Sequence, residues 1–293
     1  MIRKAVITIA GMGTRLLPVT KEMPKEMLPV FIRDSNGDLA LKPVLQLIFE
    51  QLYRDGFREF CFIVGRGKRA VEDHFTPDWG FVDKLEAKGK HSLVNSLREF
   101  YKMVEDSVII WVNQPEPKGF GHAVYMARSF VGDEPFLVSA GDTYIISTQD
   151  KHDKHVKKLI KVFFEMDADA TILLQRVTDP RMYGIAAGET LGKELLRINK
   201  VVEKPTQPLS NIAIMPLYVF KPEIMGEIGG LEPGVGGEIQ LTDAIQRLIN
   251  KSDKVIGVLL GKDDIRLDIG TPATYWKALY TSYGHASELE KVD

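Results

Sequence analysis

The residues best suited to chemistry in this chain lie near its N-terminus, in a loop that combines glycines with cations. The loop spans residues 10–29 and directly follows an apolar run at residues 5–9. Its glycines and cations are Gly11, Gly13, Arg15, Lys21 and Lys25. Backbone N–H groups can lie along phosphate oxygens, and lysine and arginine side chains can neutralise their charge. The loop therefore predicts a phosphorylated ligand, with a nucleoside triphosphate as the first candidate.

The spacing in this loop differs from the two common phosphate-binding fingerprints. A Walker A loop needs four residues between its glycines and then Gly-Lys-Ser or Gly-Lys-Thr, and a dinucleotide-binding loop needs a third glycine that opens a helix. Neither pattern is present, and Pro18, Pro24 and Pro29 prevent one continuous helix. A tight turn would account for the two glycines, but it would not require the cations.

Polar residues that follow other apolar runs extend the candidate site. These positions hold Gln114, Asp142, Asp268 and the adjacent pair Glu203 and Lys204. A carboxylate at the end of a buried strand can hold Mg²⁺ against a phosphate, although Asp268 could equally cap a helix or a turn. An amide both donates and accepts hydrogen bonds, which suits the edge of a nucleotide base.

The adjacent residues Glu203 and Lys204 could serve a phosphorylated sugar. The carboxylate can accept hydrogen bonds from hydroxyl groups while the ammonium neutralises the phosphate. Neighbouring residues on a strand point to opposite faces. The pair therefore requires an irregular strand end or a long lysine reach, and Pro205 favours a strand end at this point.

Composition and charge exclude several classes of protein. The 293 residues are 44% hydrophobic and 27% charged, as in an ordinary globular protein. A net charge of −2 gives no support for nucleic-acid or membrane binding. The single cysteine, Cys61, lies in an apolar run and is expected to be a buried strand residue. Without a disulfide partner, a signal peptide or a long apolar span, the chain is expected to be cytoplasmic.

The order of apolar and amphipathic segments predicts the fold class. Strands are expected at residues 4–10, 59–64, 107–113, 135–140 and 169–176, and helices at 43–55, 67–75, 121–130 and 153–166. This alternation predicts an α/β fold with a Rossmann-like, mixed but mainly parallel sheet flanked by helices. Ligands of such sheets bind outside the carboxyl ends of the strands, where the glycine-rich loop begins.

The pattern changes beyond about residue 180, where a smaller β-rich layer is expected. Its strands are expected at residues 184–188, 195–203 and 212–220, followed by a helix at 238–250, a strand at 254–260 and a helix at 272–283. Residues 78–106 are interpreted as a mostly helical, charged surface excursion that is available for subunit contact. Residues 34–38 are interpreted as a turn.

The N-terminal loop resembles the signature of the sugar-1-phosphate nucleotidylyltransferases. Its string Gly-x-Gly-Thr-Arg-x-Leu-Pro-x-Thr-Lys-x-x-Pro-Lys-Glu-Met-Leu-Pro is more narrowly similar to that of bacterial and archaeal UTP–glucose-1-phosphate uridylyltransferases, also called UDP-glucose pyrophosphorylases. The resemblance extends over nearly the whole chain. It implies transfer of the uridylyl group of UTP to glucose 1-phosphate, giving UDP-glucose and pyrophosphate by in-line displacement assisted by Mg²⁺.

The resemblance also implies a role for each candidate residue. As catalytic cations, Arg15 grips the β- and γ-phosphates and Lys25 neutralises charge near the α-phosphate. The nucleotide-binding positions are Ala10, Gly11, Gly13, Thr14, Gln114 and Gly119, with Gln114 reading the pyrimidine edge. The sugar-phosphate-binding positions are Gly184, Glu203, Lys204 and Asn211, and the metal ligands are Asp142 and Asp268.

On this resemblance, residues 1–293 are interpreted as a single nucleotidyltransferase domain. Its nucleotide-binding part covers about residues 1–180, and its sugar-binding and C-terminal part covers about residues 181–293. A homo-oligomer, either a dimer or a tetramer, is also expected.

Two departures from the family pattern leave the choice of nucleotide open. Thr143 follows Asp142 where many relatives have a second acid, and Pro216 and Leu217 precede Tyr218 where uridylyltransferases usually have Gly-Arg. The alternatives are a glucose-1-phosphate thymidylyltransferase, or an enzyme that accepts both UTP and dTTP. An alternative of another class is a non-catalytic sugar-nucleotide sensor.

The histidines are interpreted as structural residues rather than as catalysts. His122 is expected to belong to the start of a helix. His152 and His155 lie three residues apart in a charged segment, and we interpret them as part of a solvated helix start rather than a metal site.

Overall fold

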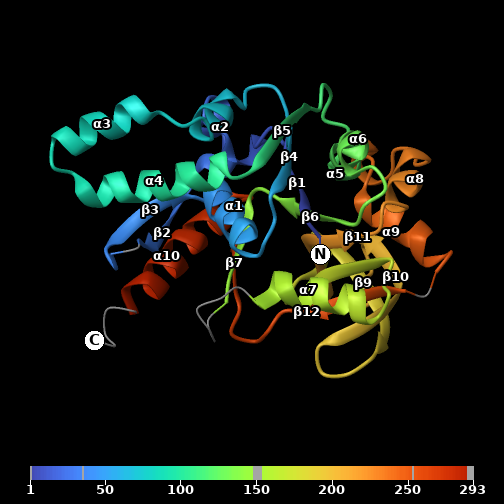
Figure 1. Cartoon of the computed structure of the whole chain (residues 1–293). Coiled ribbons are helices and arrows are strands. Elements are labelled where there is room, and N and C mark those ends of the chain that lie inside the picture. The colour runs from blue at the N-terminus through green and yellow to red at the C-terminus, as the bar shows by residue number, and fades with distance from the viewer. Residues whose placement is uncertain (1, 35, 148–153, 253, 289–293) are drawn as a thin grey trace.

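A nine-stranded sheet forms the centre of the fold, as seen in a computed structural model of the chain (Figure 1). The structure describes residues 2–34, 36–147, 154–252 and 254–288. One half of the sheet contains, in spatial order, β5 (Val108–Asn113), β4 (Glu59–Val64), β1 (Lys4–Ile9) and β6 (Phe136–Ala140). These four strands pair in parallel, as the sequence predicts.

The second half of the sheet is built mostly from antiparallel pairs. It contains, in order from β6, the strands β11 (Ile212–Phe220), β8 (Ala170–Arg176), β12 (Val255–Leu259), β10 (Leu195–Glu203) and β9 (Gly184–Thr190). Ala213 of β11 also pairs with Ile185 of β9. The five strands therefore close into a ring.

This arrangement shows how the expected β-rich layer is connected to the rest of the fold. The strands β9, β10 and β11 exist near their predicted positions, but they continue the central sheet. Alternating apolar residues identify a strand, whereas its neighbours depend on contacts between residues that are distant in sequence. The α/β class with a mixed sheet flanked by helices is confirmed, and four of the eight neighbouring strand pairs are parallel.

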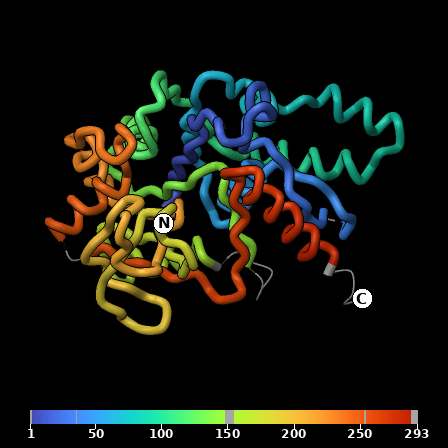
Figure 2. Tube along the Cα trace, turned by 180° about the vertical axis from the view of Figure 1, so that it is seen from behind, coloured from blue at the N-terminus to red at the C-terminus, as the bar shows by residue number. Residues whose placement is uncertain are grey.

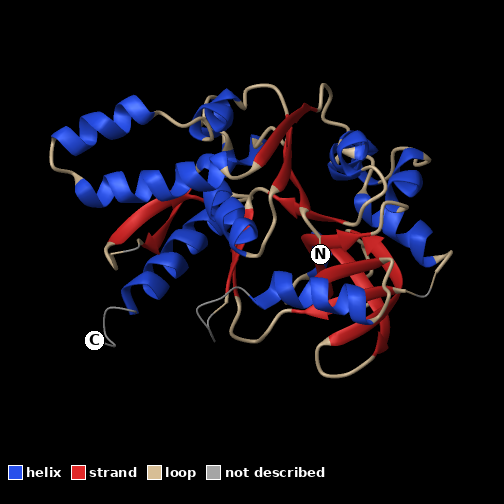
Figure 3. Ribbon diagram, in the orientation of Figure 1, coloured by secondary structure: helices blue, strands red, loops and turns tan. Residues whose placement is uncertain are grey.

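Helices cover both faces of the sheet (Figure 3). On one face lie α1 (Val44–Arg54), α4 (His91–Glu105) and α7 (Lys154–Glu165), and on the other lie α5 (Phe120–Met126), α8 (Ile224–Gly229) and α9 (Leu241–Ile249). Each face of the sheet has its own hydrophobic core, and alternate residues of β1 point into the two cores. Ala5 and Ile7 pack on the side of α1, α4 and α7, and Val6 packs on the side of α5, α8 and α9. A strand buried on both faces explains the continuous apolar run in the sequence.

Two short strand pairs lie outside the central sheet. The hairpin β2 (Pro29–Arg33) and β3 (Leu39–Pro43) flanks the turn expected at residues 34–38. In that turn, the Asp34 carboxylate accepts hydrogen bonds from the backbone N–H groups of Asn36 and Asp38, each at 2.9 Å. The other pair joins β7 (Thr143–Ile146) to β13 (Ile265–Asp268). The sequence did not predict β2, β3 or β7.

The remaining helices lie toward the two ends of the molecule. A helical hairpin of α3 (Trp79–Ala87) and α4 matches the expected excursion at residues 78–106, and the short helix α2 (Arg69–His74) precedes it. In both views, α3 and α10 (Pro272–Glu288) lie at the end opposite to β9 and β10 (Figures 1 and 2). The short helix α6 (Arg128–Val131) follows α5 directly. Within the described residues, no helix is long and apolar enough to cross a membrane.

Candidate functional site

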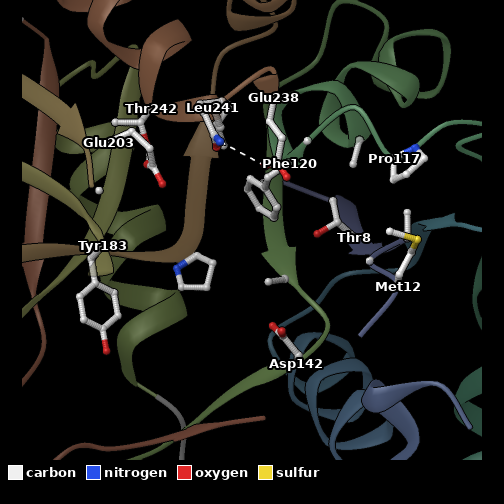
Figure 4. A pocket seen from close by; sticks show the side chains of 18 of the residues that line it. Thr8, Met12, Pro117, Phe120, Asp142, Tyr183, Glu203, Glu238, Leu241 and Thr242 are labelled. Atoms are coloured by element: carbon white, nitrogen blue, oxygen red, sulfur yellow. Dashed lines mark hydrogen bonds between the residues drawn. The ribbon is translucent and has the colours of Figure 1, made fainter. Parts of the chain in front are cut away.

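A cavity of about 510 Å³ lies at the carboxyl ends of strands from both halves of the sheet (Figure 4). Ala10 follows β1, Gln114 follows β5, and Asp142 follows β6 on the first half. Glu203 ends β10 on the second half. Figure 4 shows Glu203, Thr242 and Tyr183 on one side of this cavity and Thr8 and Met12 on the other. The topology therefore places the cavity where ligands bind in open α/β sheets.

Most of the residues predicted from the sequence line this cavity. They are Ala10, Gly11, Gly13, Thr14, Lys25, Gln114, Gly119, Asp142, Gly184, Glu203 and Lys204. Arg15 is exposed beside it, in the first of three short 3₁₀ turns that the proline-rich loop forms instead of one helix. Asn211 is exposed outside the cavity lining, where its side-chain oxygen lies 3.4 Å from Nη1 of Arg176. This geometry gives no support to a sugar contact by Asn211.

A charged pair, Lys25 and Asp142, lines the cavity. Nζ of Lys25 lies 2.5 Å from Oδ2 of Asp142, and both side chains are less than one-fifth exposed. Burial works against the charge of Lys25, but Asp142, the neighbouring Glu26 and Asp268 raise its pKa overall. The ammonium group therefore stays charged next to the position expected for a phosphate.

Asp268 joins this cluster through the pairing of β7 with β13. Asp268 is the register partner of Thr143, and the backbone N–H of Ile269 donates to the carbonyl oxygen of Asp142 at 3.0 Å. Burial and the charge of Asp142 raise the pKa of Asp268, against opposing effects of Arg266, Lys25 and Arg15. The alternative role as a helix cap is wrong, because the Thr271 hydroxyl accepts from the backbone N–H of Thr274 at the start of α10.

Asp142 and Asp268 form an acidic pair whose chemistry fits a divalent cation. Mg²⁺ is commonly bound by one or two carboxylates together with phosphate oxygens and water. No group of three or more metal-ligating side chains occurs within the described ranges. The remaining ligands would therefore come from a bound phosphate and water. Thr143, the residue after Asp142, has no carboxylate, so the second acid of such a site would come from Asp268 on another strand.

The Glu203–Lys204 end of the cavity has the irregular strand end that the sequence requires. Lys204 has a φ of 40°, in the left-handed region that residues with a side chain rarely adopt. This turn directs Lys204 to the same cavity as Glu203, and the two side chains are 3.3 Å apart. The Thr242 hydroxyl donates to Oε2 of Glu203 at 2.7 Å. One carboxylate oxygen is thus fixed from α9.

Gly184 leaves room for this carboxylate. A methyl group at its Cβ position would lie 2.9 Å from the Thr242 hydroxyl and 3.0 Å from Oε2 of Glu203. The hydrogen-bonded pair therefore occupies the space that any larger residue at position 184 would need. This is the packing reason for a glycine beside the predicted sugar-binding residues.

Elsewhere in the cavity lining, Gln114 is buried and held by the loop that follows it and by the first turn of α5. Its Nε2 lies 2.8 Å from Nδ1 of His122 and 3.3 Å from the carbonyl oxygen of Gly119. Gly119 has a φ of 106°, and a Cβ there would lie 2.7 Å from the carbonyl oxygen of Ile239. Gly119 is thus needed for a close backbone approach as well as a left-handed conformation.

Comparison with known proteins agrees with this geometry. A family model described as nucleotidyl transferase matches residues 4–283. The chain belongs to this family. It is 39% identical over 273 residues to UTP–glucose-1-phosphate uridylyltransferase 2 of Staphylococcus saprophyticus, covering 92% of this chain and 88% of that protein. It is also 39% identical over 252 residues to the UTP–glucose-1-phosphate uridylyltransferase of Bacillus subtilis, covering 84% and 80%.

Solved structures show the same nucleotidyl transferase fold. A UDP-glucose pyrophosphorylase complexed with UDP-glucose has a TM-score of 0.82 at 29% identity, covering 97% of this chain and 100% of that one. A UTP-bound UGPase from Acinetobacter baumannii has a TM-score of 0.81 at 30% identity, covering 100% and 98%. The family and the fold expected from the sequence are therefore confirmed.

The nucleotidyl transferase cavity also contains residues that the sequence did not single out. Glu26 lines the cavity at 1% exposure and pairs with Lys68, 42 positions away, at 2.7 Å. Burial raises the pKa of Glu26, against opposing effects of Lys68 and Lys25. Tyr183 lines the cavity beside Gly184, and its hydroxyl accepts a hydrogen bond from Arg266 at 2.9 Å. Both are contacts between distant segments, for which the sequence carries no local signal.

Cys61 and His155 are both buried in the structure. Cys61 is fully buried in β4, and burial raises the pKa of its thiol to about 12, as expected of an inert strand residue. His155 is 5% exposed, so its interpretation as part of a solvated helix start is wrong. Its ring lies on the inner face of α7, 3.0 Å from the Gln51 amide. His152 lies outside the described residues.

Proposed function

We propose that this nucleotidyl transferase transfers the uridylyl group of UTP to glucose 1-phosphate, giving UDP-glucose and pyrophosphate. The observation that carries the proposal is the part-buried Lys25–Asp142 pair, which lines the same cavity as Gln114 and Glu203, the residues proposed to read the base and to bind the sugar. The names of the curated relatives and the UDP-glucose complex of a structural relative support the same reaction.

The residues of the cavity suit a displacement between two anions. An oxygen of the sugar phosphate attacks the α-phosphorus of UTP, and the bond from that phosphorus to the oxygen bridging the β-phosphorus breaks. Pyrophosphate then leaves with the bonding electron pair. Repulsion between the two anions opposes this step, so correct positioning and neutralisation of charge provide the catalysis. Lys25 and Arg15 would serve the triphosphate, and Lys204 would neutralise the sugar phosphate.

Asp142 and Asp268 are the residues that would hold a divalent cation, for which we propose Mg²⁺. The bound ion would supply positive charge to the phosphate oxygens as negative charge shifts toward pyrophosphate. Burial and the charge of Asp142 raise the pKa of Asp268, and this supports the role, because an additional cation would stabilise both carboxylates in their charged form. Removal of divalent ions with EDTA should abolish turnover, and added Mg²⁺ should restore it.

The two ends of the cavity would set the choice of substrates. We infer that Gln114 reads the polar edge of uracil, a planar group that an amide can match. Glu203 would accept hydrogen bonds from sugar hydroxyls through the oxygen that Thr242 leaves accessible. Uracil and thymine differ by one methyl group, which a pocket distinguishes by only about 1–3 kcal/mol. UTP and dTTP must therefore be compared directly.

A substrate matrix tests the proposal. Pyrophosphate release is measured for UTP, dTTP, ATP, CTP and GTP against glucose 1-phosphate and other sugar 1-phosphates. We expect the highest kcat/KM for UTP with glucose 1-phosphate. A clear preference for dTTP would favour a thymidylyltransferase, and binding of UDP-glucose without any turnover would favour a sensor.

Two substitutions test the assigned chemistry within the same assay. Lys25→Met removes the buried cation and should lower kcat by about 10²–10³-fold, the usual effect of losing one group that stabilises developing charge. Lys84→Met, on the remote helix α3, is the matched control and should leave kcat unchanged. Equal activity of the Lys25→Met and wild-type enzymes would refute the assignment of Lys25.

We further propose that the chain forms a homo-oligomer, a dimer or a tetramer. The exposed aromatic residues Trp276 and Tyr280 on α10 support a contact surface, with side chains 67% and 70% exposed. Light scattering coupled to size-exclusion chromatography would give the mass in solution. A monomeric mass at micromolar concentration would contradict this proposal.

A further inference from the structure

The side-chain amide of Gln114 has both of its hydrogens engaged inside the protein. One points to Nδ1 of His122 at 2.8 Å and the other to the carbonyl oxygen of Gly119 at 3.3 Å. Gln114 is 5% exposed, so water has little access to these contacts. An amide nitrogen carries only two hydrogens. Nothing is therefore left on the nitrogen end to donate to a ligand.

These two partners also determine which end of the amide faces them. A carbonyl oxygen only accepts hydrogen bonds, so Gly119 requires the nitrogen end of the amide. His122 must then accept through Nδ1, which is the neutral imidazole with its hydrogen on Nε2. Burial and Lys118 lower the pKa of His122, against an opposing effect of Glu116, and Arg128 lowers it further. The neutral form is thus the one expected at pH 7.

We propose that His122 is a positioning residue for base selectivity, because it keeps the oxygen end of the Gln114 amide toward the nucleotide. This inference rests on the proposed function. Gln114 lines the cavity, and its Oε1 is left to accept a hydrogen bond from a ligand. His122 makes the shorter of the two contacts that hold this orientation.

This orientation distinguishes uracil from cytosine. The N3 atom of uracil carries a hydrogen, which Oε1 can accept. The N3 atom of cytosine carries a lone pair, which would face the lone pairs of Oε1. Rotating the amide by half a turn would exchange these preferences, because an amide presents a donor at one end and an acceptor at the other. The Gly119 carbonyl oxygen opposes that rotation because it can only accept. His122 adds to this, because Nδ1 could face Oε1 favourably only after the ring hydrogen had moved from Nε2 to Nδ1.

The test is the ratio of kcat/KM for UTP to kcat/KM for CTP in three variants of His122. His122→Phe keeps an aromatic ring without an acceptor, and we expect the ratio to fall about tenfold, as for the loss of one hydrogen bond. His122→Asn places an oxygen the same number of bonds from Cβ as Nδ1, and should keep the ratio within about threefold of the wild type. His122→Leu is a second variant without an acceptor, in case the phenylalanine variant does not fold.

The outcomes separate this inference from the proposed function. A wild-type enzyme that prefers UTP, together with an unchanged ratio in His122→Phe or His122→Leu, overturns the role of His122 and leaves the function intact. An equal fall in kcat/KM for both nucleotides in every variant also overturns it, because a purely structural role would not change the ratio. A wild-type enzyme with no UTP turnover overturns the proposed function and the inference together.

Discussion

Gly184 leaves the space in which the side chains of Glu203 and Thr242 form their hydrogen bond. The carboxylate of Glu203 and the hydroxyl of Thr242 are 2.7 Å apart, and the Cβ position of Gly184 lies within 3.0 Å of both. Interiors packed this closely do not absorb an added methyl group without moving a neighbour. The carboxylate expected to bind the sugar is therefore positioned by a residue that cannot itself contact the sugar through a side chain.

Gly184→Ala tests this arrangement. The added methyl group would displace Glu203 or Thr242, at about 1–3 kcal/mol. We expect kcat/KM for glucose 1-phosphate to fall about tenfold or more, with little change in the KM for UTP, in steady-state assays with each substrate varied. Gly226→Ala, on α8 with no atom within 4 Å of its Cβ position, is the control and should behave like the wild type. An equal effect of Gly184→Ala on both substrates would argue against a role confined to the sugar end.

At the scale of elements, a buried ion pair fixes the loop that precedes α2 against the N-terminal loop at residues 10–29. Glu26 is 1% exposed and Lys68 is 6% exposed, and their side chains lie 2.7 Å apart. Removing two charges from water is expensive, so a buried pair is tolerated only when both partners are present. The pair therefore joins two segments that have no strand or helix in common.

Lys68→Met removes the hydrogen-bonded partner of the buried Glu26 carboxylate, although the charge of Lys25 still acts on it. The free energy of unfolding should fall by about 3–5 kcal/mol, measured by urea denaturation at pH 7. Adding Glu26→Gln to this variant removes the unpaired charge and should recover part of the loss. Arg98→Met breaks an exposed pair with Glu86 and should change stability by no more than about 1 kcal/mol. Additive effects of the two buried substitutions would show that the residues do not interact.

The elements differ in how far the sequence predicts them. The run at residues 5–9 and the amphipathic pattern at residues 43–55 place β1 and α1 to within a residue or two, because burial on two faces or on one stripe leaves a periodic signature. β7 was not predicted, because its four residues pair only with β13, more than a hundred positions away. The pairing that brings Asp268 to Asp142 was therefore outside the reach of local patterns.

The residues of the site also differ in whether a local sequence pattern or only a distant contact identifies them. Asp142 and Glu203 lie at the ends of apolar strands, and Lys25 belongs to the loop that follows β1. That placement predicts a shared cavity at one edge of the sheet. Asn211 was assigned by resemblance alone, and the structure leaves it outside the cavity lining. The sequence around Lys68 does not predict its burial, because the residues that surround it come from other segments of the chain.

At the scale of the whole molecule, stability toward acid should depend on one buried histidine. His155 of α7 is 5% exposed, and its ring lies 3.0 Å from Gln51 of α1 and 3.5 Å from Ser147. Burial lowers the pKa of His155 to about 4. The unfolded chain binds a proton at this residue below about pH 6.5, while the folded chain does not until about pH 4. Stability is therefore present at neutral pH and is lost as the pH falls between these values.

The expected loss from this residue is about 2 kcal/mol in the free energy of unfolding between pH 7 and pH 5. His155→Gln cannot take up the proton, so its stability should change less over the same interval, even if it starts lower at pH 7. Urea denaturation at the two pH values measures both slopes. Parallel slopes for the variant and the wild type would show that other groups control the sensitivity to acid.

The left-handed backbone of Lys204 means that selection for stability and selection for turnover should favour different residues at this position. A side chain in that conformation costs roughly 1–2 kcal/mol that glycine does not incur. In a library randomised at position 204, survival of heating alone should enrich glycine, whereas growth dependent on nucleotide-sugar synthesis should retain lysine. Such opposed enrichment would identify a position at which the fold gives up stability for activity.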